Sequence, residues 1–352
     1  MNIKKFSFAL LTTVATVAIL TALLYFLGLT LVNPKKPSLS VAYPTNTLYL
    51  PAQNLGFLRY QFSPHFTGKE WNTNFSINSF GFRGPEFEFA KPANTIRVLC
   101  LGDSCTFGTG GLADSDTYPV LLEGLLNKDQ NARNFEVINA GMPGFSVYDG
   151  FILLKQRQLM NLKPDFIIIC YGWNDHMGAA INDNIKSYKR LINTFIWQHV
   201  RFHSLLWYIL TKKYKNSEVQ NYLEPKNTYR VTRSQYEYYL SKIIDLAGSN
   251  NSKVLVMTAP WEPRLMSSNV GWLIESTLVS FYLHPAYVNL TKKVSYEKGA
   301  VLIDLYLIYE SEKTDNPRDF FVDPFHYNRN LAFMIAAEIS RVIYKITDKA
   351  QL

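Results

Sequence analysis

A serine with a candidate catalytic setting follows an apolar run in the first third of the chain. Residues 97–110 read RVLCLGDSCTFGTG, so Gly102, Asp103 and Ser104 come directly after the apolar residues 98–101. Gly, Asp and Ser are common turn residues and can simply end a buried strand. The carboxyl ends of parallel strands are also where α/β proteins hold their reacting groups. The stretch therefore allows two interpretations, a plain turn or a nucleophile at Ser104.

A candidate general base lies near the C-terminus in FVDPFHYN, where Asp323 precedes His326 by three residues. Acyl transfer requires a nucleophile, a base that takes its proton, a group that orients the base, and donors for the oxyanion. His326 can serve as the base, and Asp323 can hold its imidazole in the required tautomer. The sequence therefore predicts a triad of Ser104, His326 and Asp323.

Candidate oxyanion donors follow two further apolar runs. NAGMPG ends at Gly144, and IIICYGWND contains Asn174. A glycine lets the substrate approach the backbone closely. We expect the donors to be the Ser104 amide, the Gly144 amide and the Asn174 side chain, with Gly141 as an alternative to Gly144.

Other residues that could do chemistry allow competing interpretations. Cys105 is a possible nucleophile beside Ser104, although no activating arrangement singles it out. His199 and His203 are spaced as zinc ligands can be, but Val200 stands where a metalloprotease motif has glutamate, which favours a surface or lid role. We therefore predict no metal site, and acyl transfer by a serine triad requires no metal or organic cofactor.

Three charged residues near these motifs are interpreted as structural. Asp103 and Asp175 follow apolar runs, where we expect them to brace the turns. Arg83, in NSFGFRGPEF, could pair with a carboxylate or be surface charge, and we favour the surface interpretation.

Alternating apolar and amphipathic segments predict the elements that would position these residues. Five nearly continuous apolar runs are typical of strands covered on both faces, and they lie at 95–101, 135–140, 165–171, 253–259 and 300–305. Helical patterns lie at about 115–127, 147–161, 233–248, 286–298 and 329–346. Strands that alternate with helices predict a parallel sheet in a three-layer α/β/α sandwich.

With these motifs in place, the sequence resembles the SGNH hydrolases, also called the GDSL esterase/lipase family. Four blocks match in order, namely GDS, the glycine of NAGMPG, the asparagine of GWND, and DPFH. The resemblance covers about residues 94–346. It implies a five-stranded flavodoxin-like sheet in which the strands at 95–101 and 165–171 are adjacent.

The resemblance also implies the role of each site residue. Ser104 would be the nucleophile, Gly144 and Asn174 would complete the oxyanion hole, and Asp323 and His326 would complete the triad. The chain departs from the family pattern at Cys105, which replaces the usual apolar neighbour, and at Tyr327, where many members have proline. Neither departure removes a catalytic atom.

The N-terminus predicts a membrane anchor. After a short basic segment at 1–5, residues 6–32 contain no charged side chain, which is longer than the about 7–15 apolar residues of a secretory signal. An uncleaved or late-cleaved signal is the alternative. We expect a single-pass helix at 6–32, a linker and docked arm at 33–93, and the hydrolase domain at 94–352 outside the cytoplasm.

A basic, aromatic insert interrupts the predicted domain at 176–216. It carries seven Lys and Arg residues, with Asp183 as its one acidic residue, and so holds most of the net charge of +8. Such a segment suits a membrane interface or a lid over the core. The chain shows no zinc-finger spacing and no basic zipper, so we predict no nucleic-acid partner.

These observations predict a membrane-anchored serine esterase that forms an acyl-enzyme. Its predicted substrates are acylated small molecules, glycans or lipids, with O-acyl groups on envelope or secreted glycans favoured. An O-acyltransferase or a lysophospholipase would use the same triad. A non-catalytic envelope binding or assembly module is the alternative of another class.

Overall fold

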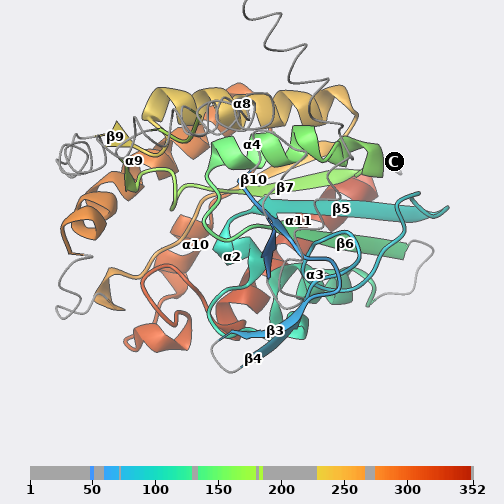
Figure 1. Cartoon of the computed structure of the whole chain (residues 1–352), viewed down its shortest axis with the longest axis horizontal. Helices are drawn as coiled ribbons and strands as arrows, with labels where there is room; N and C mark the ends of the chain where they lie inside the picture. The colour runs from blue at the N-terminus through green and yellow to red at the C-terminus, as the bar shows by residue number, and fades with distance from the viewer. Residues whose placement is uncertain are drawn as a thin grey trace, which may run out of the picture. The chain divides into compact units, whose positions relative to one another are not determined.

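The five apolar runs form one parallel sheet in the computed structural model of the chain (Figure 1). The strands are β5 (Thr95–Gly102), β6 (Asn134–Gly141), β7 (Phe166–Cys170), β10 (Lys253–Met257) and β11 (Val301–Ile303). Their spatial order is β11–β10–β7–β5–β6. The predicted five-stranded sheet is confirmed, and so is the adjacency of its first and third strands, because β5 pairs in parallel with β7.

The structure describes residues 48–50, 59–70, 73–128, 134–179, 182–184, 228–265 and 274–349, all of which belong to one compact unit. The predicted anchor at 6–32 and most of the predicted insert lie outside these residues. Within the described part, no helix combines the length and apolar character needed to cross a membrane.

Helices cover both faces of the sheet, as predicted for a three-layer sandwich (Figure 1). One face is covered by α4 (Val147–Gln156), α8 (Arg233–Ser249) and α9 (Ile274–Glu297). The other face is covered by α3 (Tyr118–Leu126), α10 (Leu305–Glu312) and α11 (Arg329–Lys349). Successive residues of a strand point to opposite faces of the sheet. Leu99 therefore packs under α4, α8 and α9, and Val98 packs under α3, α10 and α11.

One predicted helix has the wrong start. The segment expected at 286–298 is the end of α9, which begins at Ile274. Proline usually ends a helix because it lacks an N–H and crowds the preceding turn. Here α9 continues through Pro285, and the flanking residues His284 and Tyr287 are fully buried.

The described parts of the predicted arm pack against the sheet domain. The short strand β1 (Tyr49–Leu50) pairs with β2 (Gln61–Phe62), and β3 (Thr67–Glu70) pairs with β4 (Thr73–Ser76). Phe62 is buried and packs on Phe107, behind the predicted nucleophile.

The surface interpretation of Arg83 is wrong. Its side chain is 1% exposed, and its guanidinium donates to Asp114 Oδ1 at 2.7 Å. It also donates to the carbonyls of Gly108 and Leu112, which belong to the loop after the candidate nucleophile. A buried guanidinium requires several acceptors, and this loop supplies them.

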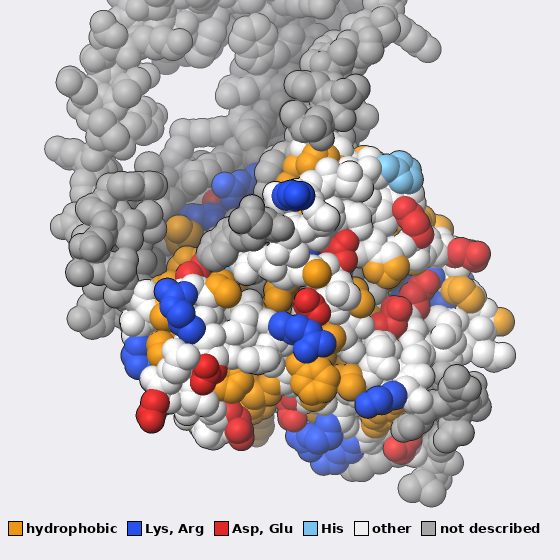
Figure 2. Space-filling model, turned by 90° about the horizontal axis from the view of Figure 1, so that it is seen from below, with side chains coloured by type: hydrophobic (Ala, Val, Ile, Leu, Met, Phe, Trp, Pro, Cys, Tyr) orange, Lys and Arg blue, Asp and Glu red, His pale blue; other side chains and the backbone are white. Residues whose placement is uncertain are grey.

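The first residues of the predicted insert belong to the core. β8 (Gly178–Ala179) pairs with β9 (Thr228–Tyr229), and Asp183 is buried in an ion pair with Arg230 at 2.8 Å. Asp183 is therefore a structural carboxylate and not part of a solvated basic face. On the described part of the face in Figure 2, acidic and basic side chains are interspersed.

Candidate active site

Ser104 lies at the point where β5 gives way to the short helix α2 (Ser104–Phe107). Asp103 caps this helix, and its Oδ1 accepts the Cys105 N–H at 2.9 Å. A Cβ at Gly102 would lie 2.0 Å from Thr106 Oγ1, so the sharp turn requires glycine there. As the first helical residue, Ser104 has no helical acceptor for its N–H. Its side chain is half-buried, and among the described residues the structure gives its N–H no acceptor. Both groups lie at the carboxyl end of β5.

The structure brings Ser104 together with both residues predicted near the C-terminus. His326 Nε2 lies 2.9 Å from Ser104 Oγ, and His326 Nδ1 lies 2.7 Å from Asp323 Oδ2. Asp323 Oδ1 accepts the N–H groups of Phe325 and His326, at 3.0 and 2.7 Å. Burial would raise the pKa of Asp323, but the hydrogen bonds and charge of His326 outweigh it and lower the pKa, which keeps the carboxylate ionised.

Asn174 lies beside this group, at the end of β7. Its Nδ2 donates to Asp103 Oδ2 at 3.3 Å, so one carboxylate holds both the start of α2 and the Asn174 side chain. Burial raises the pKa of Asp103. Asp103 and Asp175 both have structural contacts, as predicted, but only Asp103 braces the turn at its own strand end, whereas Asp175 bonds the first residue of α4.

Gly144 occupies the third position of a turn from Met142 to Phe145, which the Phe145 N–H closes on Met142 O at 3.1 Å. Its φ of +74° is one that glycine adopts freely. Among the described residues the structure gives the Gly144 N–H no acceptor. The alternative donor is occupied, since the Gly141 N–H donates to Asn139 Oδ1, and a Cβ at Gly141 would lie 2.2 Å from Phe107 N. The geometry therefore favours Gly144.

Comparison with known proteins identifies the family. A model of the GDSL-like lipase/acylhydrolase family matches residues 100–330. The chain belongs to this family. It is therefore a hydrolase that acts on esters. No curated protein matches the chain significantly.

Similar solved structures include the lipase/acylhydrolase from Enterococcus faecalis, at 21% identity and a TM-score of 0.44, covering 70% of this chain and 95% of that chain. An acetylxylan esterase from Geobacillus stearothermophilus matches at 17% identity and a TM-score of 0.44, covering 72% of this chain and 95% of that chain.

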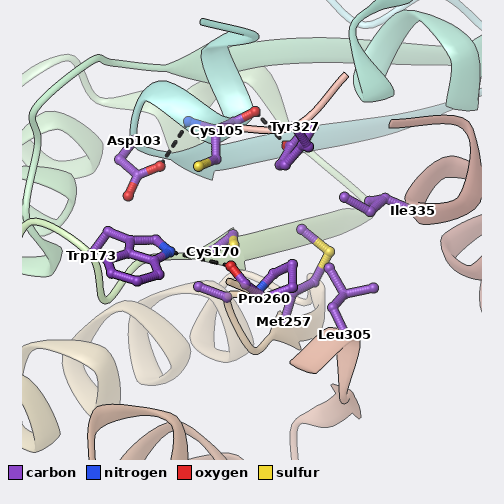
Figure 3. Close-up of a pocket in the computed structure, with 10 residues that line it drawn as sticks. Asp103, Cys105, Cys170, Trp173, Met257, Pro260, Leu305, Tyr327 and Ile335 are labelled. Carbon is purple, nitrogen blue, oxygen red and sulfur yellow. Dashed lines mark hydrogen bonds between the residues drawn. The ribbon is translucent and has the colours of Figure 1, made fainter. Parts of the chain in front are cut away.

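The two departures from the pattern of the GDSL-like family contact each other. Tyr327 donates its hydroxyl hydrogen bond to Cys105 O and so connects the His326 loop to α2. The Cys105 thiol donates to Phe325 O at 3.3 Å. Figure 3 shows both residues beside a small apolar cavity that Cys170, Trp173 and others line.

The buried position of Cys105 argues against the alternative nucleophile. Burial raises the pKa of the thiol well above its ordinary value, and the carboxylates of Asp103 and Asp323 raise it further. A thiol that stays protonated is a poor nucleophile. We expect Cys105→Ala to change the activation free energy for ester hydrolysis by less than about 1.4 kcal/mol, a factor of ten in kcat/KM. Loss of ester hydrolysis and of labelling by a fluorophosphonate probe in this variant would contradict the assignment of Ser104 as the nucleophile.

His199 and His203 lie outside the described residues. Two histidines that sequence reasoning did not single out are paired in the core instead. His176 Nε2 lies 3.0 Å from His284 Nδ1, and His284 stacks on Trp173 with ring centroids 3.8 Å apart. Burial lowers the pKa of His284 to about 4. This neutral pair supports the loop that carries Asn174.

Asp175 connects the Asn174 loop to the helix that follows the Gly144 turn. Its Oδ1 accepts the N–H of Val147, the first residue of α4, at 2.9 Å. Ser146 caps the same helix, and its hydroxyl bonds the buried Asp183 carboxylate at 2.9 Å. Burial raises the pKa of Asp175 to about 8, so its neutral form is favoured at pH 7.

This raised pKa predicts a pH-dependent effect of Asp175→Asn. Between the unfolded pKa near 4 and the folded pKa of about 8, the folded wild-type protein binds more protons, so this group stabilises it less as pH rises. The variant cannot ionise at this position. Its free energy of unfolding relative to wild type should rise by about 1.4 kcal/mol per pH unit across this range. Urea unfolding at pH 5 and pH 7 measures the change, and an equal difference at both would contradict it.

Proposed function

We propose that the chain is a membrane-anchored serine esterase in which Ser104 is the nucleophile and His326 the general base, with Asp323 orienting the base. The continuous hydrogen-bonded series from Ser104 Oγ through the imidazole to the Asp323 carboxylate carries this proposal. An ionised Asp323 that accepts from Nδ1–H leaves Nε2 as the acceptor for the serine proton.

The proposed reaction has two halves. Ser104 Oγ attacks the ester carbonyl while His326 Nε2 takes its proton, and the imidazolium then gives this proton to the leaving alkoxide as the ester C–O bond breaks. In the second half His326 takes a proton from water, the hydroxide attacks the acyl-enzyme, and the proton returns to Ser104 Oγ. The products are an acid and an alcohol.

The proposed oxyanion hole consists of the Ser104 N–H, the Gly144 N–H and the Asn174 side chain. Each comes from the end of a different strand of the sheet, β5, β6 or β7. Donors held by the backbone before the reaction need no reorganisation when the negative charge develops.

We propose O-acyl groups on envelope or secreted glycans as the substrate. Lipid hydrolysis needs a wide apolar groove beside the nucleophile. Eight large hydrophobic side chains of the described part are exposed, namely Phe89, Met177, Tyr238, Tyr296, Val301, Leu302, Leu307 and Phe333. Among them only Met177 lies within five positions in the sequence of a proposed site residue, Asn174. The exposed Arg59, in contrast, donates a hydrogen bond to Gly144 O. A polar substrate fits this setting better.

The substrate proposal is tested with the full-length chain in detergent and a panel of acetylated sugars, lysophospholipids and short-chain esters. We expect the highest kcat/KM for an acetylated oligosaccharide. A higher kcat/KM for lysophospholipids than for acetylated sugars would overturn the proposal of a glycan substrate. It would leave the esterase mechanism in place.

We also propose that residues 6–32 anchor the chain and that the hydrolase domain lies outside the cytoplasm. The uncharged run of the sequence supports this proposal. After alkaline extraction of cell membranes, the full-length chain should stay in the membrane fraction, and protease added to intact spheroplasts should degrade it. Release into the extract would contradict the anchor, and protection from protease would contradict the orientation.

A further inference from the structure

Two adjacent residues of the arm contact the turn that carries Gly144. Tyr60 donates its hydroxyl hydrogen bond to Pro143 O, and Arg59 Nη1 donates to Gly144 O at 2.9 Å. The Tyr60 ring is held edge-on against Phe145, with centroids 5.0 Å apart. Both arm residues lie outside the segment at 100–330 that the family model matches. The arm therefore adds to this turn contacts that the matched domain does not itself contain.

The carbonyl that Tyr60 holds belongs to the same peptide unit as the proposed oxyanion donor. Pro143 C=O and Gly144 N–H are the two polar groups of one planar peptide bond, and this bond is trans, as are the others in the structure. In a trans peptide the C=O and N–H point in opposite directions. A donor that fixes Pro143 O from one side thus fixes the direction of the Gly144 N–H on the other.

The sequence of the turn permits two directions for this peptide. Proline at the second position and a glycine with φ +74° at the third are typical of a type II turn. A type I turn has the same ends and also accepts proline at the second position, but its central peptide is reversed. In that form the Gly144 N–H would point to the opposite side. Glycine adopts either conformation readily, so an outside contact can stabilise one over the other.

We propose that Tyr60 is a positioning residue of the oxyanion hole, which holds the Pro143–Gly144 peptide so that the Gly144 N–H faces the reacting carbonyl. The inference rests on the proposed function, in which this N–H is a donor. A hydrogen bond to the carbonyl also polarises the amide and strengthens its N–H as a donor. Arg59 restrains the following peptide, so the two arm residues hold both peptide units that flank the Gly144 Cα.

The test is Tyr60→Phe in the full-length chain, since phenylalanine keeps the ring against Phe145 and removes only the hydroxyl. Removing one oxyanion donor lowers kcat by about 10²–10³. A donor that is present but wrongly oriented should lower kcat by less. We expect kcat for p-nitrophenyl acetate to fall about tenfold with little change in KM. The reason is that the Gly144 N–H stabilises the negative charge that develops on the carbonyl oxygen in the transition state. Affinity for a methyl trifluoromethyl ketone, whose adduct with Ser104 places an oxyanion in the hole, should fall by the same factor.

Tyr344→Phe is the matched control. It removes a part-buried phenol that donates to a backbone carbonyl, Leu126 O, at 2.9 Å, where α11 packs on α3. We expect wild-type kcat and wild-type ketone affinity in this variant. An equal loss of kcat in both variants would mean that Tyr60 acts only through general stability, and would overturn the inference.

The remaining outcomes separate this inference from the proposed function. Wild-type kcat and ketone affinity in Tyr60→Phe would overturn the positioning role while leaving the esterase mechanism intact. Absence of ester turnover and of a ketone adduct in the wild-type chain would overturn the proposed function, and the role of Tyr60 with it.

Discussion

Ser104→Ala should lower kcat for p-nitrophenyl acetate by about 10⁴–10⁶ and abolish the burst of product that reports an acyl-enzyme. The reason is specific to the geometry. The hydroxyl is the atom that His326 Nε2 contacts at 2.9 Å, and no other described nucleophile has this partner. The cost for folding should be small because the Ser104 side chain is half-buried and begins a helix that Asp103 caps.

Pre-steady-state kinetics of the purified full-length chain measure both effects. Cys105→Ala is the neighbouring control and should retain the burst. A Ser104→Ala protein with wild-type turnover would remove Ser104 from the mechanism. A burst that disappears only in Cys105→Ala would transfer the role to the thiol.

Asn174→Ala should lower kcat by about 10²–10³, because it removes one donor to the oxyanion and leaves two backbone donors in place. KM should change little, since the contact strengthens only as the carbonyl oxygen gains charge. The variant also leaves Asp103 without the Asn174 amide, but Asp103 keeps the Cys105 N–H at 2.9 Å.

Steady-state kinetics with an activated acetyl ester measure this loss. The control is Asn161→Ala, which removes an exposed amide that donates to Gln158 Oε1. Asn139→Ala is unsuitable, because the Asn139 side chain accepts the Gly141 N–H beside the site. Asn161→Ala should have wild-type kcat. A loss in Asn174→Ala that lies entirely in KM would contradict the role in the oxyanion hole.

Local patterns in the sequence are sufficient to predict the sheet and the position of the site. Buried parallel strands are apolar throughout, so runs such as that of β7 stand out, and the polar residues that follow them collect at one edge. Asp323 and His326 lie three residues apart, so their pairing can be predicted from their spacing alone. The joining of His326 to Ser104 across 222 residues depends instead on the order of the four motifs.

The long-range contacts that hold the site in place cannot be predicted from local patterns in the sequence. Arg83 resembles a surface charge, because nothing local shows that four groups of another loop will surround it. Tyr60 has no pattern that relates it to Pro143, 83 residues away. Asp183 lies in a basic segment, and its neighbours in sequence give no sign that Arg230 holds its carboxylate inside the domain. Each of these contacts is made by side chains from distant segments, and only the folded chain reveals them.

The most direct test of Ser104 as the nucleophile is to label the full-length protein with a fluorophosphonate probe. Mass spectrometry of its peptides then identifies the labelled residue. Such probes react preferentially with a serine that a base has activated. The contact between His326 Nε2 and Ser104 Oγ predicts labelling on Ser104 with a stoichiometry close to one, and its loss in His326→Ala. An unlabelled Ser104, or label on another residue that persists in Ser104→Ala, would contradict the account.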